Sequence, residues 1–203
     1  MARERATDIT ALVAAAAEAF RNKGYRNATI DDIAEAAGIS RPTVYKYTRS
    51  KQHLLDLMVD EVTGDLGRRT KEVLDSGEAP QVRLRGMISA HIEAASANRT
   101  FYAIVFSEEV ELSDQGRESF RTWAHERTQD FCRLLDECAP ISGVEVDTTI
   151  AANLVLSMLS TLYRWYDPTG PVAPEDLSRQ IERLLGALFG SPVLDSSVFG
   201  PSA

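Results

Sequence analysis

The chain has 203 residues, 44% of them hydrophobic and 26% charged, as is usual for a folded protein of one or two domains. Its longest uncharged run, residues 148–163, is too short and too rich in Thr, Asn and Ser to span a membrane. The polar N-terminus lacks the apolar core of a signal peptide, so we expect a cytoplasmic protein with no membrane partner.

The net charge of −8 is unevenly distributed along the chain. Residues 1–53 hold nine Lys or Arg and six Asp or Glu, a net +3, whereas residues 54–203 hold thirteen and twenty-four, a net −11. An asymmetry of this kind favours a part that faces nucleic acid joined to a module with another task. The +3 is unremarkable over fifty residues, so charge alone decides nothing.

Two short helices are predicted near the N-terminus. Apolar residues at positions 9, 12, 13, 16 and 20 share one helical face, with Thr7 or Asp8 as the N-cap and a glycine at the end. A second helix starts after Thr29, which stands three residues before Asp32 in the spacing of a capping box, and it ends before Gly38.

A third predicted helix follows after a very short turn. Only Ile39 and Ser40 separate it from Gly38; Ser40 is a favourable N-cap, and Pro42 suits the first turn. Two helices joined in this way are typical of a helix-turn-helix unit, whose second helix reads DNA with its N-terminal half. The exposed side chains expected on this helix can bind phosphates and base edges: Arg41, Thr43, Tyr45, Lys46 and Tyr47. The alternative for Tyr45 and Tyr47 is that one of them packs in the core and only the other faces DNA.

The stretch TIDDIAEAAGISRPTVYKYTRSKQHLL resembles the DNA-binding signature of the TetR family of transcriptional repressors, and the match runs from about Ile9 to Leu55. The resemblance implies an all-α fold of about nine helices, with a three-helix helix-turn-helix domain and a helical C-terminal domain for ligand binding and dimerisation. We place the first domain at residues 1–52, the second at 53–190 and a C-terminal tail at 191–203.

The resemblance also implies which residues contact DNA. Thr29 and Lys51 fall where family members hold phosphates, and the start of the third helix falls where bases are approached. Thr48 stands where the family usually has a buried Phe, which puts the packing of this helix in question. The predicted DNA-binding residues are Thr29, Ser40, Arg41, Pro42, Thr43, Tyr45, Lys46, Tyr47 and Lys51.

The rest of the chain is also predicted to be helical. A long amphipathic helix runs from Ser50 towards Gly77, and others begin at Pro80 and Pro174. The apolar run at residues 101–106 fits a strand or a buried helix, and its helical surroundings favour the helix. A helix after it is expected to end at Pro140. Residues 148–166 are apolar nearly all round, as in a helix buried on several sides. In the TetR family the last two long helices pair with their copies, so the resemblance implies a homodimer.

An unusual share of the aromatic residues lies in the middle helices, and ligand sites are mostly apolar cavities with a few polar groups. The candidate ligand-binding residues are Met87, His91, Phe101, Tyr102, Phe106, Phe120, Trp123, Asn153, Tyr163, Arg164 and Trp165. Core packing and a dimer interface are the alternative roles for these side chains. The segments FSEEVELS and LYRWYDPTGPVAPEDLS are similar to those of actinobacterial-type TetR repressors that sense fatty or steroid-derived acyl-CoA thioesters.

Sequence motifs for catalysis are absent: the chain has no G-x-S-x-G, Walker or dinucleotide-binding motif and no paired metal-ligand motif. We therefore expect no enzyme, no cofactor and no metal, and two reduced thiols at Cys132 and Cys138.

The predicted function is a repressor that binds a palindromic DNA operator as a homodimer and is released by a small hydrophobic inducer, such as an acyl-CoA. The alternatives are a helical protein-interaction module and an activating regulator with a different apolar ligand.

Overall fold

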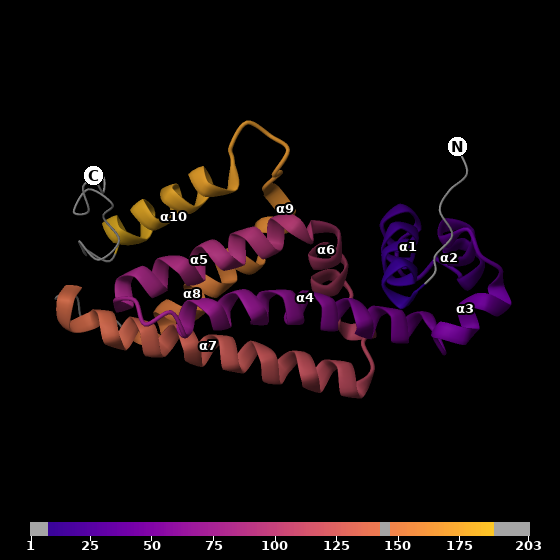
Figure 1. Ribbon diagram of the computed structural model, residues 1–203, viewed down its shortest axis with the longest axis horizontal. Coiled ribbons are helices and arrows are strands. Elements are labelled where there is room, and N and C mark those ends of the chain that lie inside the picture. The colour runs from indigo at the N-terminus through magenta and orange to yellow at the C-terminus, as the bar shows by residue number, and fades with distance from the viewer. Residues whose placement is uncertain (1–7, 143–146, 189–203) are drawn as a thin grey trace. The chain divides into compact units, whose positions relative to one another are not determined.

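The computed structural model describes residues 8–142 and 147–188, and every regular element in these ranges is helical (Figure 1). The all-α class predicted from the sequence is therefore confirmed. In chain order the elements are α1 (Ile9–Lys23), α2 (Ile30–Ala37), α3 (Arg41–Tyr47), α4 (Lys51–Leu74), α5 (Pro80–Ala97), α6 (Arg99–Ser107), the 3-10 turn η1 (Glu109–Glu111), α7 (Asp114–Ser142), α8 (Thr148–Ser160), α9 (Leu162–Trp165) and α10 (Pro174–Leu188).

The described residues form two compact units. The first contains residues 8–64 and Asn98–Thr122, and the second contains Asp65–Ala97 and residues 123–188. The helices α4 and α7 each contribute residues to both units. The domain boundary that we placed after residue 52 stays a prediction, and the tail at 191–203 lies outside the described residues.

None of the helices in the described ranges is long and apolar enough to cross a membrane.

The three helices at the start of the first unit begin and end at the predicted signals. The Asp8 carboxylate accepts a hydrogen bond from Ala11 N at 2.8 Å and caps α1. A complete capping box of Thr29 and Asp32 starts α2, and Gly38 ends it in the left-handed conformation at φ 67°, which a side chain would oppose. These signals set the tight turn into α3.

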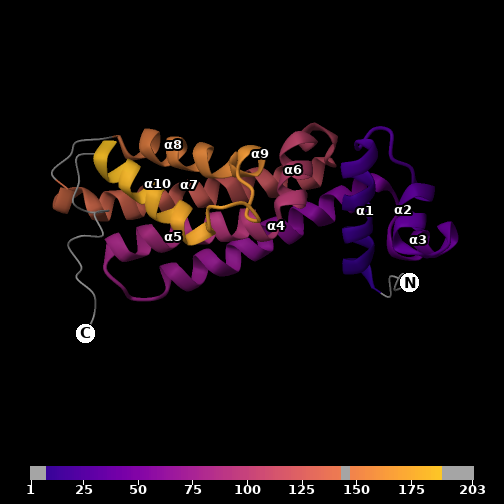
Figure 2. The same cartoon turned by 90° about the horizontal axis from the view of Figure 1, so that it is seen from above.

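A small apolar core holds α1, α2 and α3 together, and both views show the three helices side by side (Figures 1 and 2). Leu12 and Ala16 of α1, Ile33 of α2 and Val44 of α3 are all fully buried. Their burial places one face of α3 inward, so its remaining side chains are directed to solvent.

Thr48, at the position where a buried Phe was expected from the resemblance, is itself buried, with only 2% of the residue exposed. Its hydroxyl donates to Ser50 O at 2.9 Å and lies 3.0 Å from His53 Nδ1. Because the hydroxyl has a single hydrogen, the His53 ring donates the second hydrogen bond. The buried polar group is thereby satisfied, and it joins the end of α3 to the start of α4.

The segment after α6 is bonded to α4 and to the loop between α1 and α2, within the first unit. Arg26, in the loop before α2, forms an ion pair with Glu111 at 3.1 Å, and the side chain of Gln52 donates to Glu111 O at 2.9 Å. The carboxylate of Asp56 accepts from Ser113 N at 3.1 Å. These contacts fix η1 and the beginning of α7 against α4 and the α1–α2 loop.

Two details of the second unit differ from the sequence predictions. Helix α8 is not enclosed on all sides in the single chain, because Ile150 and Leu154 remain 58% and 62% exposed. Helix α7 does not end at Pro140 but continues to Ser142. A proline removes only one backbone N–H donor. Near the end of a long helix, the loss of that one hydrogen bond is small compared with the backbone hydrogen bonds of the preceding turns.

Candidate DNA interface and ligand site

The outward face of α3 gathers the predicted DNA-contacting side chains. Arg41, Pro42, Lys46 and both tyrosines of the helix are exposed, with Tyr45 at 48% and Tyr47 at 36%, so neither tyrosine lies in the core. Thr43 is partly exposed. Ser40 caps the helix: its Oγ lies 3.4 Å from Thr43 N and 2.8 Å from Thr43 Oγ1. The arrangement presents basic, hydroxyl and aromatic groups on a helix of seven residues.

Arg41 is held in place by two neighbours. Its Nη1 donates to Asp31 Oδ2 of α2 at 2.9 Å, and its guanidinium carbon lies 5.9 Å from the centre of the Tyr45 ring. A hydrogen bond with Tyr45 and the negative charge of Asp31 both raise the pKa of Arg41. The guanidinium at the start of α3 is therefore charged and oriented before any ligand arrives.

Lys51 has a structural task that its position in the sequence did not reveal. Its ammonium donates to the backbone carbonyls of Tyr25, Arg26 and Ala28 at 2.5, 3.0 and 3.1 Å, and it lies 4.5 Å from the centre of the Tyr25 ring. These bonds attach the start of α4 to the loop between α1 and α2. A phosphate contact by Lys51 stays a prediction.

Thr29 is likewise engaged within the protein. Its hydroxyl donates a hydrogen bond to Asp32 Oδ2 at 2.8 Å, and Asp32 also accepts a hydrogen bond from Lys23 Nζ at 2.5 Å. The hydrogen bond from Lys23 and those from Thr29 lower the pKa of Asp32 to about 2. The side chain of Thr29 is exposed at the start of α2, where a phosphate contact stays a prediction.

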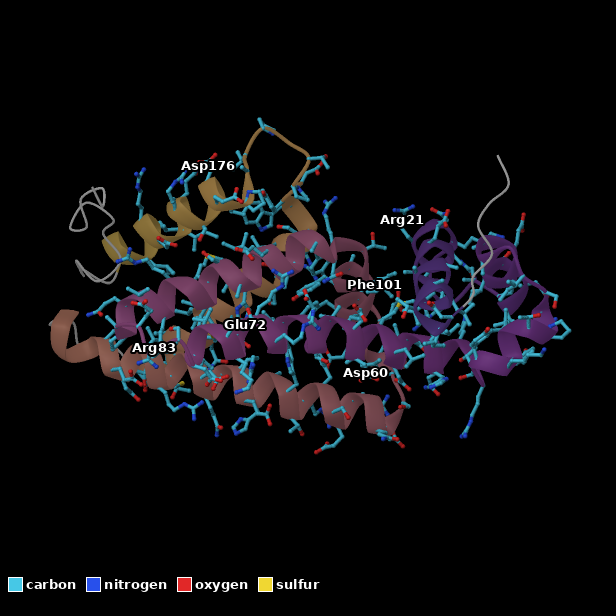
Figure 3. All side chains as sticks on the ribbon, in the orientation of Figure 1. Arg21, Asp60, Glu72, Arg83, Phe101 and Asp176 are labelled. Atoms are coloured by element: carbon cyan, nitrogen blue, oxygen red, sulfur yellow. The ribbon has the colours of Figure 1, made fainter. Side chains whose placement is uncertain are left out.

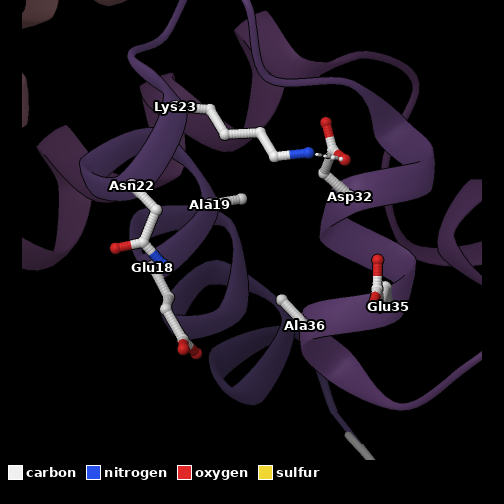
Figure 4. A pocket seen from close by; sticks show the side chains of 7 residues that line it. All are labelled: Glu18, Ala19, Asn22, Lys23, Asp32, Glu35 and Ala36. Carbon is white, nitrogen blue, oxygen red and sulfur yellow. Dashed lines mark hydrogen bonds and ion pairs between the residues drawn. The ribbon is translucent and has the colours of Figure 1, made fainter.

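A small open groove of about 170 Å³ lies between α1 and α2, and the ion pair of Lys23 and Asp32 borders it (Figure 4). Its charged lining is mainly acidic, since Glu18 and Glu35 join Asp32 there. Carboxylates repel phosphate, so the lining of this groove does not favour an anionic ligand.

The candidate ligand residues of the first unit form an aromatic cluster from α6 and α7. The ring centres of Tyr102 and Phe106 are 5.9 Å apart, and Phe106 meets Phe120 edge to face at 5.7 Å. Tyr102 and Phe120 are buried, while Phe101 and Phe106 are partly exposed; Phe101 projects from α6 in Figure 3.

In the second unit, Met87 and His91 of α5 are buried. The His91 Nδ1–H donates to Met87 O at 2.7 Å, and its ring meets Phe131 edge to face at 5.3 Å. The other ring nitrogen, Nε2, has no hydrogen-bond partner among the described residues. Burial, and then the positive charge of Arg127, lower the pKa of His91 to about 4, so the ring is neutral at pH 7.

The remaining candidate ligand residues lie nearer the surface of the second unit. Asn153 is exposed and donates to Thr149 O at 2.8 Å, while Trp123 is partly buried. Arg164 and Trp165 are exposed, and Arg164 packs on the partly exposed Tyr163, 5.6 Å from the ring centre. Their part in ligand binding stays a prediction.

The sequence analysis missed a buried polar group on α7. Arg127 Nη1 donates to Thr70 Oγ1 at 2.7 Å and Nη2 pairs with Asp130 Oδ2 at 2.8 Å, and both partners are buried. The available signal was an arginine at 3–4 spacing within an otherwise apolar helical face. A charge in that position is either paired in the interior or placed to meet a ligand.

Both parts of the chain match known protein-family models. The model described as bacterial regulatory proteins of the tetR family matches residues 12–58, and the one described as a tetracyclin repressor-like C-terminal domain matches residues 77–189. The chain belongs to the tetR family. The resemblance found in the DNA-binding segment is thus confirmed, and with it the N-terminal helix-turn-helix followed by a helical C-terminal domain. The family consists of DNA-binding regulators and is not a family of enzymes.

Individual relatives are similar over most of the chain. The HTH-type transcriptional repressor KstR2 of Mycolicibacterium smegmatis is 26% identical over 172 residues, which cover 83% of this chain and 84% of the relative. The HTH-type transcriptional activator FasR of the same organism is 25% identical over 163 residues, or 79% and 73% of the two chains. The crystal structure of PfmR, a TetR family transcriptional regulator from Thermus thermophilus, is 27% identical with a TM-score of 0.79, and the match covers 86% of this chain and 96% of PfmR.

Proposed function

We propose that this tetR family protein is a transcriptional repressor that binds a palindromic operator as a homodimer and is released by a small hydrophobic inducer. The main support for the proposal is the outward face of α3, where Arg41, Tyr45 and Lys46 are exposed. The opposite face of this helix is held in the core by the fully buried Val44. The similarity to the repressor KstR2 supports the repressing direction.

The α3 face supports two kinds of DNA contact. The first turn, with Arg41, Pro42 and Thr43, would approach base edges in the major groove, where an arginine recognises guanine and a threonine recognises several bases. The phosphate backbone would be contacted from the rest of α3 by Tyr45, Lys46 and Tyr47. Further phosphate contacts would come from Ser40, Thr29 and Lys51. Phosphate contacts supply affinity without sequence preference, so specificity is expected to come from the first turn.

Exposed apolar side chains on α8 and α10 support the homodimer. Leu184 of α10 is 52% exposed, in addition to Ile150 and Leu154 of α8. Such residues gain free energy when a second copy covers them. A two-fold dimer also matches a palindrome, because its two α3 helices meet half-sites about 34–36 Å apart or at a multiple of that spacing.

The inducer is proposed to be a fatty or steroid-derived acyl-CoA. The aromatic cluster of α6 and α7 in the first unit favours an apolar ligand. In the second unit, the neutral ring of the buried His91 keeps an unused acceptor that could receive a ligand hydroxyl. Arg164 is the proposed partner for a phosphate. The inducer works only through its affinity difference between two states, so ~100-fold derepression requires about 2.8 kcal/mol.

Selection of bound fragments from random DNA tests the proposal, followed by titration of the selected duplex with and without long-chain acyl-CoA. We expect a palindrome, bound by a dimer and released by the acyl-CoA. Arg41→Ala and Thr43→Ala should relax base preference, while folding and dimerisation persist. The absence of any enriched sequence from a folded dimer would favour the helical interaction module. A palindrome indifferent to acyl-CoA would refute the inducer class alone.

An activating regulator is the second candidate, because the similarity to FasR extends over 79% of this chain. A promoter carrying the selected operator, fused to a reporter, separates the two directions. A repressor lowers reporter output when it is expressed without inducer, and an activator raises it.

A further inference from the structure

Asp31 stands out on the first turn of α2, because the capping task of an acidic residue in this turn is already performed by its neighbour. The capping carboxylate is Asp32, which accepts hydrogen bonds from Thr29 and Lys23. Asp31 instead accepts a hydrogen bond from Arg41 Nη1 at 2.9 Å, across the helix-turn-helix. Both partners are exposed.

A carboxylate beside the reading helix has a cost for DNA binding. DNA presents a dense row of negative phosphates, and a like charge beside them weakens association with any sequence. An exposed ion pair also contributes little to the stability of the fold. An acidic residue in the first turn also stabilises its helix through the helix dipole, so Asp31 contributes modestly to α2 with or without Arg41. General DNA affinity does not account for Asp31, and its contact with Arg41 points to a further role.

We propose that Asp31 is a positioning residue that confers specificity: it holds Arg41 for base recognition, and its negative charge lowers the affinity for DNA of any sequence. This inference rests on the proposed function of α3. A guanidinium has five N–H donors in a rigid fork, so it can keep a carboxylate at one edge and offer another edge to a base. The Tyr45 ring, 5.9 Å from the guanidinium carbon, limits the same side chain from a second direction.

Without Asp31, Arg41 is free to turn towards the nearest phosphate. Binding to unrelated DNA then becomes tighter because one repulsive charge is lost and one phosphate contact is gained. Binding to the operator improves less, because the oriented base contact is lost at the same time. The ratio of operator affinity to non-specific affinity therefore falls.

The test compares Asp31→Asn with Glu35→Gln in the full chain. Glu35 is also an exposed acid of α2 and lines the groove between α1 and α2, so its substitution changes the net charge equally without removing the contact to Arg41. Dissociation constants are measured for the selected operator and for a scrambled duplex at several salt concentrations. Circular dichroism checks that both variants are folded.

For Asp31→Asn we expect non-specific affinity to rise on the order of fivefold and its salt dependence to steepen by about one phosphate contact. The operator-to-scrambled ratio should fall, and base preference should broaden at the position that Arg41 reads. Glu35→Gln should leave the ratio unchanged. In an Arg41→Ala background, Asp31→Asn should no longer alter base preference.

Equal changes of both affinities in the two acidic variants would overturn the inference, since net charge would then explain everything. An undiminished base-preference effect of Asp31→Asn in the Arg41→Ala background would overturn it too. The proposed function itself fails in a different way, namely if the unmodified protein selects no operator.

Discussion

At the scale of single residues, three buried or half-buried polar groups have partners that the linear sequence did not indicate. Lys51 binds three backbone carbonyls, Arg127 joins Thr70 and Asp130, and His91 uses only one of its two ring nitrogens within the described residues. Each of these groups is costly to leave without partners in the interior. Substitutions at these three places are therefore expected to lower the stability of the fold.

Lys51→Met is expected to lower the free energy of unfolding by roughly 1–3 kcal/mol, because the carbonyls that it serves lose a charged donor. Lys46→Met is the matched control, since Lys46 is exposed on α3. It should leave stability unchanged and weaken binding to all DNA sequences alike. Urea denaturation and binding titrations measure the two effects. Equal stability of both variants would contradict the structural role of Lys51.

His91 predicts a pH dependence of stability. Its pKa is about 4 in the folded protein and near 6.5 when the chain is unfolded, so between these values the unfolded state binds more protons. Stability must therefore rise with pH from about 4 to 6.5, and the contribution is fully present above 6.5. His91→Gln should flatten this part of the pH profile in chemical denaturation, relative to the unmodified protein. A profile of the same slope in both would contradict the assignment.

At the scale of elements, the junction of α3 and α4 depends on a side chain that departs from the usual family pattern. Thr48 is too small to fill the volume of a Phe, yet its hydroxyl bonds Ser50 O and His53. The junction is thus held by hydrogen bonds at a place where apolar packing is usual. Because α3 carries the candidate DNA contacts, the geometry of this junction decides where they point.

Thr48→Val keeps the shape of the side chain but removes the hydroxyl. We expect a loss of about 1–3 kcal/mol in unfolding free energy, because buried polar groups are left unsatisfied. Thr48→Ser should retain most of the stability, and Thr10→Val, an exposed site on α1, should have little effect. Thermal and urea denaturation of the three variants provide the comparison. Equal stability of Thr48→Val and Thr10→Val would show that the hydroxyl is dispensable.

At the scale of the whole molecule, the exposed apolar residues of α8 and α10 indicate a surface that the single chain leaves uncovered. Leu154→Glu places a charge there and is expected to convert a dimer into monomers, because burying an unpaired charge costs several kcal/mol. Sedimentation velocity measures the mass, and operator titration should show the accompanying loss of affinity. Glu126→Gln on α7 serves as a surface control. A Leu154→Glu protein that remains dimeric would place the interface elsewhere.

The sequence by itself determined the helical class, the capped ends of α1, α2 and α3, and the candidate residues on the outward face of α3. These features depend on local spacing: a capping box, a glycine in the left-handed region and an apolar period of 3–4 residues act within one turn of their own helix. The end of α7 was predicted wrongly, at Pro140, because a proline alone is a weaker signal. The helix continues past it, since the other backbone hydrogen bonds of its last turn compensate for the missing donor.

Only the tertiary structure decided the partners of Arg41 and Lys51, and it showed that Asn153, Arg164 and Trp165 lie at the surface of the single chain. The carbonyls that Lys51 binds lie 23 to 26 positions away in the chain, and Asp31 lies ten from Arg41. Such contacts depend on how helices pack, which no local spacing encodes. The residues that could read DNA were thus predictable, whereas the residues that hold them in position were not.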